Sequence, residues 1–376
     1  MTTPRYTPLA EALPSTVPFV GPEAQERARG QAFTARLGAN ESMFGPSPLA
    51  IEAMARAARD VWMYGDPEVF ELREAIAAHH GVTPAHVIVG EGIDALLGLL
   101  VRLTVGPGDV VVTSNGAYPT FNFHVAGFGG ALHKVPYIGD HEDPEALAAR
   151  ATELGAKLVY LANPDNPMGS HHPAQTITRL LDALPEGTLL VLDEAYVELA
   201  PPGTEAVVDP DDPRLIRFRT FSKAHGMAGL RVGYGLAEPG PITAFDKVRN
   251  HFGLGRIAQA GALAAVQDRA WLDHVRAEVD AAREALGKIA RAHGLRPLPS
   301  ATNFVALDCG GDGDMARAVL AALGARGVFV RMPGVAPLDR CIRISLGTPQ
   351  AMATLAQALP DALDQARQAV AGRLGG

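Results

Sequence analysis

The sequence predicts an α/β fold in which a mostly parallel sheet of seven strands lies between helices, followed by a smaller α+β domain. Three observations support this prediction. Short β-branched runs recur from about residue 85, helix-like stretches lie between many of them, and the pattern changes after about residue 255. Several of the runs are continuously apolar, as strands buried on both faces require.

The first part of the chain contains all seven predicted strands of the main sheet. They are His86–Gly90, Asp109–Thr113, Leu132–Pro136, Lys157–Ala162, Thr188–Asp193, Leu215–Thr220 and Arg231–Leu236. Helices are predicted between many of them, including Ile93–Leu103, Pro144–Leu154 and Pro173–Ala183. Alternation of strands and helices is typical of a sheet covered on both sides.

The second part of the chain changes to a mixed pattern. Arg256–Ala292 predicts one or two long helices, because its apolar positions recur at helical spacing. After it come a strand, a helix, two strands and a final amphipathic helix, predicted at Asn303–Leu307, Met315–Leu323, Val328–Arg331, Cys341–Ser345 and from Pro349. The Pro- and Gly-rich start cannot form a domain alone. We therefore expect an arm at 1–45 that contributes to the small domain, a large domain at 46–255 and a small domain at 256–376.

The composition is that of an ordinary globular protein. The chain has 376 residues, 47% of them hydrophobic and 20% charged, and a net charge of −8. The acidic balance disfavours a nucleic-acid-binding role, and no run approaches the ~20 apolar residues of a membrane span. The start of the chain lacks the apolar segment of a signal peptide. We expect a cytoplasmic protein with Cys309 and Cys341 buried as thiols.

Polar segments come after the first and fourth predicted strands. Ligand-binding groups in an open α/β sheet gather at the carboxyl ends of the strands. The first strand ends in Gly90-Glu91-Gly92 and leads into a helix, whose free amides suit an anion. In the fourth segment two Asn-Pro steps restrict the backbone and present Asn166 as a donor. Taken separately, each segment is equally consistent with an ordinary turn.

Ionisable groups come after the next two strands. Asp193 stands directly after an apolar run, where a carboxylate is costly unless it meets a positive partner, and Tyr196 is three residues further on. A helix cap is the alternative for Asp193. Ser222 and Lys223 come after the sixth strand, with Arg231 eight residues after the lysine. A desolvated amine beside cations becomes nucleophilic, as a Schiff-base lysine must be.

Taken together, these segments match the requirements of pyridoxal phosphate. That cofactor needs a lysine for its aldehyde, a carboxylate for its pyridine nitrogen, donors for its ring oxygen and an anion site for its phosphate. The glycine fingerprint of nicotinamide-binding folds is absent, which disfavours an oxidoreductase. No metal site is expected, because the adjacent pairs His79-His80 and His171-His172 lack the spacing of two ligands on one helix face.

Several motifs resemble one enzyme family. NPDNPMG, DEAYVEL, RTFSKAHGMAGLRVGY and CIRISLGT are similar to segments of fold-type I pyridoxal-phosphate aminotransferases, specifically the histidinol-phosphate aminotransferase group. The resemblance begins at Leu37 and runs in the same order over about four-fifths of the chain. It implies a large domain with a seven-stranded sheet and a smaller α+β domain.

The resemblance also implies roles at the cofactor. Lys223 would form the bond to the cofactor aldehyde and then move the proton between substrate and cofactor, and Asp193 would pair with the pyridine nitrogen. Tyr196 and Asn166 would donate hydrogen bonds to the ring oxygen. The phosphate would be held by a further set of groups, which are Ser222, Arg231, the amides of Glu91 and Gly92, and Tyr64 of a second copy of the chain.

At the substrate, the resemblance implies that Arg343 takes a carboxylate or phosphate group, with Asn40 and Arg331 as neighbours. Several positions depart from the family pattern, among them the turn Gly90-Glu91-Gly92. Phe121 replaces a tyrosine that stacks on the cofactor ring, and Phe19 replaces a tyrosine whose hydroxyl contacts the substrate phosphate. NPMG also stands where NPTG is usual. These departures leave open whether the substrate is phosphorylated.

The expected activity is transfer of an amino group from histidinol phosphate, or from an aromatic or other amino acid, to a 2-oxo acid such as 2-oxoglutarate. A decarboxylase or other lyase on the same scaffold, similar to threonine-phosphate decarboxylase, is the alternative chemistry. A pyridoxal-phosphate-binding regulator is a further alternative, although the residues before Leu37 are too few and too Pro-rich to hold the usual DNA-binding domain. We expect a homodimer, because Tyr64 must reach a neighbouring site.

Overall fold

The computed structural model describes residues 4–14 and 20–374. Phe19, expected near the substrate, lies outside the described residues. The large part of the fold is built on a sheet of seven strands in the order β2-β8-β7-β6-β5-β3-β4. These strands are β2 Val87–Gly90, β3 Val110–Ser114, β4 Ala131–Val135, β5 Leu158–Ala162, β6 Leu189–Asp193, β7 Leu215–Thr220 and β8 Gly233–Ala237.

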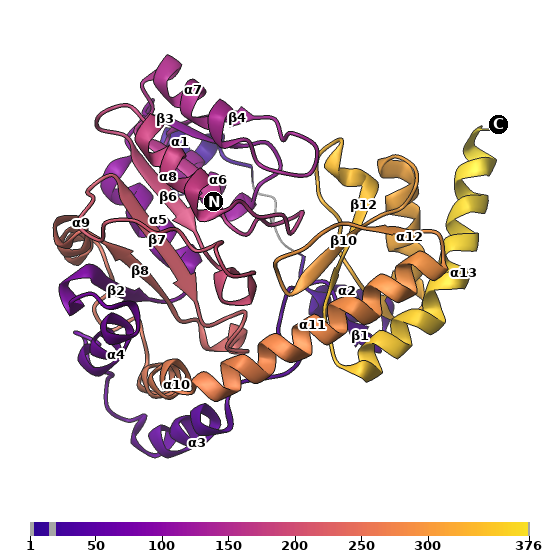
Figure 1. The fold of residues 1–376 in the computed structure, drawn as a ribbon, viewed down its shortest axis with the longest axis horizontal. Coiled ribbons are helices and arrows are strands. Elements are labelled where there is room, and N and C mark those ends of the chain that lie inside the picture. Colours follow the sequence, from indigo (N-terminus) through magenta and orange to yellow (C-terminus); the bar gives the residue numbers. More distant parts are fainter. Residues whose placement is uncertain (1–3, 15–19, 375–376) are drawn as a thin grey trace.

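Both faces of this sheet are covered by helices (Figure 1). One face packs on α5 (Ile93–Thr104) and α6 (Pro119–Gly127), through side chains such as Leu97 and Phe121. The other face packs on α7 (Pro144–Leu154) and α8 (Ala174–Ala183). Because both faces are buried, every residue of the central strand β5, Leu158–Ala162, is buried. The predicted fold class is confirmed, and β8 is the strand that runs antiparallel to both its neighbours.

The smaller part of the fold contains a three-stranded antiparallel sheet of order β12-β10-β9. Its strands are β9 Arg296–Pro297, β10 Phe304–Asp308 and β12 Cys341–Ser345, and its helices are α12 Gly313–Ala325 and α13 Pro349–Leu374. A short pair, β1 (Ala35–Arg36) with β11 (Val328–Phe329), joins the start of the chain to this part. Cys309 and Cys341 are buried free thiols.

One long helix connects the two parts, and the helix before it belongs to the large part. The long helix α11 (Arg269–Ala292) runs from the large part across to the small one (Figure 1). The helix before it, α10 (Arg256–Gln267), packs with α3 (Pro48–Ala57) and α4 (Phe70–His80) in a core that also contains residues of β2 and β8. This packing favours a domain boundary at Asp268, between α10 and α11, rather than at residue 255.

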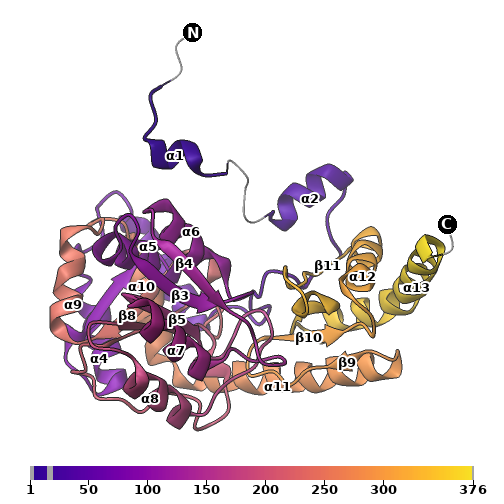
Figure 2. The same cartoon turned by 90° about the horizontal axis from the view of Figure 1, so that it is seen from above.

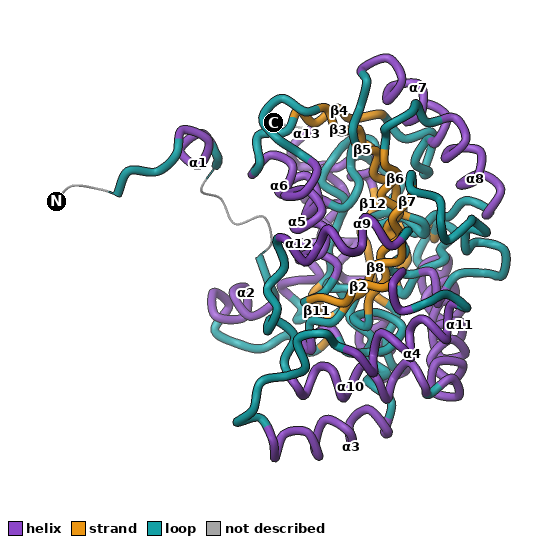
Figure 3. Tube along the Cα trace, turned by 90° about the vertical axis from the view of Figure 1, so that its left-hand side faces the viewer, coloured by secondary structure: helices purple, strands orange, loops and turns teal. Residues whose placement is uncertain are grey.

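The start of the chain stands apart from the rest. Helix α1 (Pro8–Ala12) has no buried residue and lies away from the body of the molecule, as Figures 2 and 3 show from two sides. Helix α2 (Pro22–Arg29) is tied to β1 by ion pairs from Arg36 to Glu23 and Glu26. In the described ranges, no helix is both long and apolar enough to cross a membrane.

Candidate active site

A cavity of about 760 Å³ opens at the carboxyl ends of the central parallel strands. The last residues of β5, β6 and β7, which are Ala162, Asp193 and Thr220, all line it. The small domain contributes Arg331 and Arg343 from the opposite side. The chain therefore brings groups from distant segments to the edge of the sheet where α/β folds bind their ligands.

Lys223 reaches this cavity from the turn after β7. Its Nζ donates a hydrogen bond to the backbone oxygen of Asn40 at 3.1 Å and lies 5.6 Å from the centre of the Tyr196 ring. Burial, followed by the positive charge of Arg343, lowers the pKa of this amine to about 8. An amine with a lowered pKa is more often neutral at physiological pH, which makes it a nucleophile and a proton acceptor.

Asp193 is the last residue of β6 and only 5% exposed. One carboxylate oxygen accepts a hydrogen bond from the Tyr160 hydroxyl at 2.7 Å, and the other accepts from the Ala195 amide at 2.9 Å. Burial raises the pKa of this carboxyl to about 6. Since both donors are neutral, a cationic group entering the cavity would favour the ionised carboxylate.

One wall of the cavity is a set of linked polar groups. The Asn40 amide donates to the Tyr196 hydroxyl at 2.9 Å, and the Arg343 guanidinium donates to the Asn166 side-chain oxygen. Arg343 also donates to the backbone oxygen of Gly38 at 3.3 Å. Asn40 adopts a left-handed backbone with φ 55, which asparagine tolerates better than most residues. The chain thereby aligns Tyr196, Asn166 and Arg343 around one space.

The anion end of the cavity lies between the turn after β7 and the start of α5. Arg231 donates to the Ser222 hydroxyl at 3.2 Å, and its guanidinium lies 3.8 Å from Asp94. Gly92 has a φ of +88, and a Cβ added there would lie 2.5 Å from the Arg231 guanidinium. Only glycine fits at this position, so the guanidinium packs directly on the backbone.

The cavity reaches the predicted anion site at the first turn of α5. Ile93 and Asp94, at the N-terminus of α5, line the cavity, whereas Glu91 and Gly92 do not. The Glu91 side chain turns toward Gly253, where an added Cβ would clash with its carboxylate. The backbone amides of the first turn of α5 are therefore the better candidates for an anion.

The structure corrects the prediction for Phe121. Its ring is fully buried and stacks on Tyr160, with centroids 4.6 Å apart, so it does not line the cavity. Tyr118 lines the cavity instead, and its hydroxyl donates to Asp94 at 3.4 Å. Tyr118 was not among the predicted site residues. Its place in the segment after β3, at the same edge of the sheet, is the one signal that could have found it.

Tyr64 does not line the cavity of its own chain. It is 77% exposed, and its ring lies 4.9 Å from that of Phe252. The predicted contact of Tyr64 with a second copy of the chain stays a prediction.

The residues of the cavity fit pyridoxal phosphate on structural grounds. A nucleophilic amine, a buried carboxylate with neutral donors and a guanidinium packed on the backbone before α5 converge on one space, at Lys223, Asp193 and Arg231. Ser222 and Arg231 supply donors for a phosphate, and Tyr196 and Asn166 lie on the wall beside Lys223. This donor set is what the cofactor requires.

Comparison with known proteins supports the same conclusion. Residues 34–359 match the family model described as aminotransferase class I and II. Histidinol-phosphate aminotransferase of Anaeromyxobacter sp. (strain Fw109-5) is 38% identical over 348 residues, which cover 92% of this chain and 95% of that protein.

Solved structures are similar over nearly the whole chain. The crystal structure of histidinol-phosphate aminotransferase from Sinorhizobium meliloti in complex with pyridoxal-5'-phosphate has a TM-score of 0.93 and 53% identity, covering 96% of this chain and 98% of that one. A tetra mutant of Thermus thermophilus aspartate aminotransferase has a TM-score of 0.75 and 26% identity, covering 89% and 98%. The chain therefore belongs to the class I and II aminotransferase family and is a pyridoxal-phosphate-dependent aminotransferase of fold type I.

Proposed function

We propose that this aminotransferase takes its amino group from histidinol phosphate and passes it to a 2-oxo acid such as 2-oxoglutarate. The observation that carries the proposal is the excess of positive charge in the cavity. The cavity is lined by five cationic side chains and three carboxylates. The cations are Lys134, Lys223, Arg231, Arg331 and Arg343, and the carboxylates are Glu41, Asp94 and Asp193. Such a cavity favours substrates that carry a phosphate or two carboxylates. The names of the similar proteins point to the same donor.

The residues nearest the reacting atoms have separate roles in this proposal. Bound pyridoxal phosphate supplies an electron sink for the bond broken at the substrate carbon. Lys223 accepts and returns the proton at that carbon, because its amine is buried and its pKa is lowered. Asp193 would bind the pyridine nitrogen, Tyr196 and Asn166 would donate to the ring oxygen, and Ser222 with Arg231 would hold the phosphate.

The far end of the substrate would be bound by the arginines of the small domain. Within residues 4–14 and 20–374, Arg343 Nε is buried and has no hydrogen-bond partner, so this guanidinium retains a donor for an anionic substrate. Arg331 donates to the backbone oxygen of Val20 at 2.8 Å, which brings the N-terminal arm to the same end of the cavity. One guanidinium pair would thus serve the phosphate of the donor and a carboxylate of the acceptor in turn.

A homodimer is part of the proposal. Large apolar side chains are exposed close to one another in sequence on the loop and helix that come after α3, at Val61, Trp62, Tyr64 and Phe70. A second copy of the chain that covers these residues would bury them and bring Tyr64 to a neighbouring cavity. The cytoplasmic location expected from the sequence remains part of the same proposal.

The test is a comparison of amino donors at a fixed concentration of 2-oxoglutarate. Histidinol phosphate should give the highest kcat/KM, ahead of L-phenylalanine, L-histidine and L-glutamate. Arg343→Lys should raise the KM for histidinol phosphate about tenfold or more, since an ammonium cannot reproduce a bidentate guanidinium contact. A higher kcat/KM for an unphosphorylated amino acid would contradict the proposed donor. Release of carbon dioxide in place of a keto product would favour the lyase alternative.

A further inference from the structure

Tyr160 is a buried tyrosine that contacts the candidate cofactor site from behind. It lies on β5 opposite Val191 of β6, two residues before Asp193, so Tyr160 and Asp193 share one face of the sheet. Its side chain is fully buried and does not line the cavity. Its hydroxyl donates to Asp193 Oδ2 at 2.7 Å. A polar group this deep in the core needs a partner, and the carboxylate provides it.

Phe121 fixes the ring of Tyr160. The two rings are stacked with an interplanar angle of 16°, and both side chains are fully buried. Burial raises the pKa of the Tyr160 hydroxyl well above its ordinary value, so the group keeps its proton and acts as a donor. The stacked pair therefore presents a fixed hydrogen-bond donor to one oxygen of the carboxylate.

We propose that Tyr160 is a positioning residue that holds the Asp193 carboxylate in its binding orientation and keeps it ionised for the pyridine nitrogen of the cofactor. The inference rests on the proposed role of Asp193 and deepens it. A carboxylate held from two sides, by Tyr160 and the Ala195 amide, loses little freedom when the cofactor binds. Phe121, although absent from the cavity wall, acts on the site through Tyr160.

Removal of the Tyr160 hydroxyl changes the pKa of Asp193 in a direction that the surrounding groups determine. The hydrogen bond from Tyr160 favours the ionised form and so opposes the burial that raises the pKa of the Asp193 carboxyl. The other titratable groups that face it are Lys223 after β7, Asp94 on α5, Tyr118 before α6, Tyr196 after β6 and Glu142 before α7. None of these changes in a Tyr160→Phe variant. Loss of the hydroxyl must therefore raise the pKa of Asp193, and the carboxylate is protonated at a higher pH.

The experiment measures the dissociation constant of pyridoxal phosphate as a function of pH. For Tyr160→Phe we expect affinity about tenfold weaker at neutral pH, the cost of one hydrogen bond to a charged group. We also expect the acid midpoint, where the variant loses affinity for the cofactor, to move to higher pH. Unchanged affinity together with an unchanged midpoint would overturn the proposal.

A matched control separates positioning from general destabilisation. Tyr137 also donates to a buried carboxylate, that of Asp165 at 2.9 Å, but Tyr137 and Asp165 do not line the cavity. Tyr137→Phe removes the same kind of bond, and we expect it to leave the acid midpoint of cofactor binding in place. An equal shift in both variants would contradict a specific role for Tyr160.

A double-mutant cycle with Asp193→Asn separates this inference from the proposed function. If Tyr160 acts through Asp193, Tyr160→Phe should weaken cofactor binding in the wild-type background and have no further effect in Asp193→Asn. An additive loss would overturn the inference. Full affinity in Asp193→Asn alone would instead overturn the proposed role of Asp193, whatever the tyrosine does.

Discussion

The fold places the amine of Lys223 where a positive charge is unfavourable. Burial and the nearby Arg343 shift its pKa from 10.5 to about 8, so the folded chain releases this proton more readily than the unfolded chain does. Burying the charged amine lowers the free energy of unfolding. This loss is complete below about pH 8 and disappears as the pH rises toward 10.5. The residue that we propose for catalysis therefore destabilises the fold near neutral pH.

This loss predicts a pH-dependent effect of Lys223→Met on the cofactor-free protein. At neutral pH the free energy of unfolding of the variant should exceed that of wild type by about 3 kcal/mol. Each pH unit by which the pKa of Lys223 is lowered corresponds to about 1.4 kcal/mol. The difference should shrink between pH 8 and 10.5. Urea unfolding at several pH values measures it. Lys288→Met on the exposed face of α11 is the control, expected within about 0.5 kcal/mol at every pH.

Some residues of the candidate site could be predicted from the sequence and others could not. The groups after β6 and β7 could be predicted, because a carboxylate and a lysine after buried strands stand out against their apolar surroundings. Phe121 was wrongly placed at the cavity. Close to the start of a helix, a shift of a few residues determines whether a ring faces the cavity or the core. Tyr118 and Tyr160 depend on long-range packing, which no local pattern of the sequence reveals.

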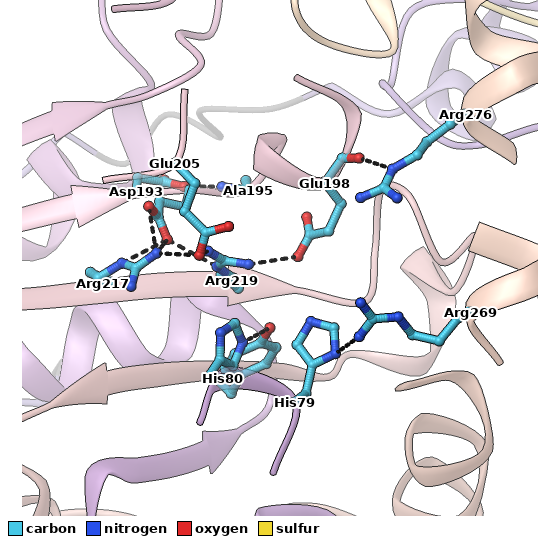
Figure 4. A network of polar contacts seen from close by, with 12 residues as sticks. His79, His80, Asp193, Ala195, Glu198, Glu205, Arg217, Arg219, Arg269 and Arg276 are labelled. Atoms are coloured by element: carbon cyan, nitrogen blue, oxygen red, sulfur yellow. Dashed lines mark hydrogen bonds and ion pairs between the residues drawn. The ribbon is translucent and has the colours of Figure 1, made fainter. Parts of the chain in front are cut away.

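At the scale of elements, the segment after β6 is held by a network of buried charges (Figure 4). Arg219 of β7 is 3% exposed, donates to Glu194 at 2.9 Å and pairs with Glu205. Its guanidinium also lies 3.8 Å from Glu198, whose backbone oxygen accepts from Arg276 of α11 at 2.6 Å. These contacts link the segment that contains Tyr196 to the helix that joins both domains.

Removal of Arg219 should be strongly destabilising. Arg219→Met keeps the aliphatic stem but removes a buried cationic partner of Glu198 and of Glu194, which then keeps its contact with Arg217. The free energy of unfolding should fall by about 3–5 kcal/mol. Arg150→Met on α7 removes an exposed ion pair with Glu153 and should cost under about 1 kcal/mol. Equilibrium unfolding in urea compares the two variants, and similar losses would contradict a structural role for the buried network.

The turn after β7 depends on a close approach of two backbones. Gly226 has a φ of +68, and a Cβ there would lie 2.2 Å from the backbone oxygen of Gly45. Gly226→Ala should therefore displace the turn that holds Lys223 and weaken cofactor binding as well as stability. Gly155→Ala has a similar φ of +61 with open space around it, and should cost only about 1 kcal/mol from backbone strain. Retained cofactor affinity in Gly226→Ala would show that the contact is dispensable.

At this scale the elements themselves were predictable. Short β-branched runs, several of them continuously apolar, identified every strand of the main sheet to within a few residues, because both faces of that sheet are buried. The boundary between the domains was harder to predict, because α10 and α11 share one helical sequence pattern and yet pack in different cores. Only the tertiary contacts distinguish them.

At the scale of the whole molecule, the proposed role of Tyr64 requires that two chains share each site. Tyr64 is exposed and does not line the cavity of its own chain. Helix α1 extends from the body without burying a residue (Figure 2). A mixture of Tyr64→Ala and Lys223→Ala chains should then regain activity, because each hybrid dimer contains one site with neither change. Re-association at equal amounts should give about one quarter of wild-type activity. No recovery above the two separate variants would argue against a shared site.

The most direct measurement of the central claim is a spectroscopic titration of the purified holoenzyme. The protein should show the visible absorbance of bound pyridoxal phosphate, lose it when histidinol phosphate is added, and regain it with 2-oxoglutarate. Lys223→Ala should neither show the wild-type spectrum nor complete this cycle. If wild-type protein lacks the absorbance, or if Lys223→Ala retains the same spectrum and cycle, the assignment of Lys223 and of this cavity as the active site is wrong.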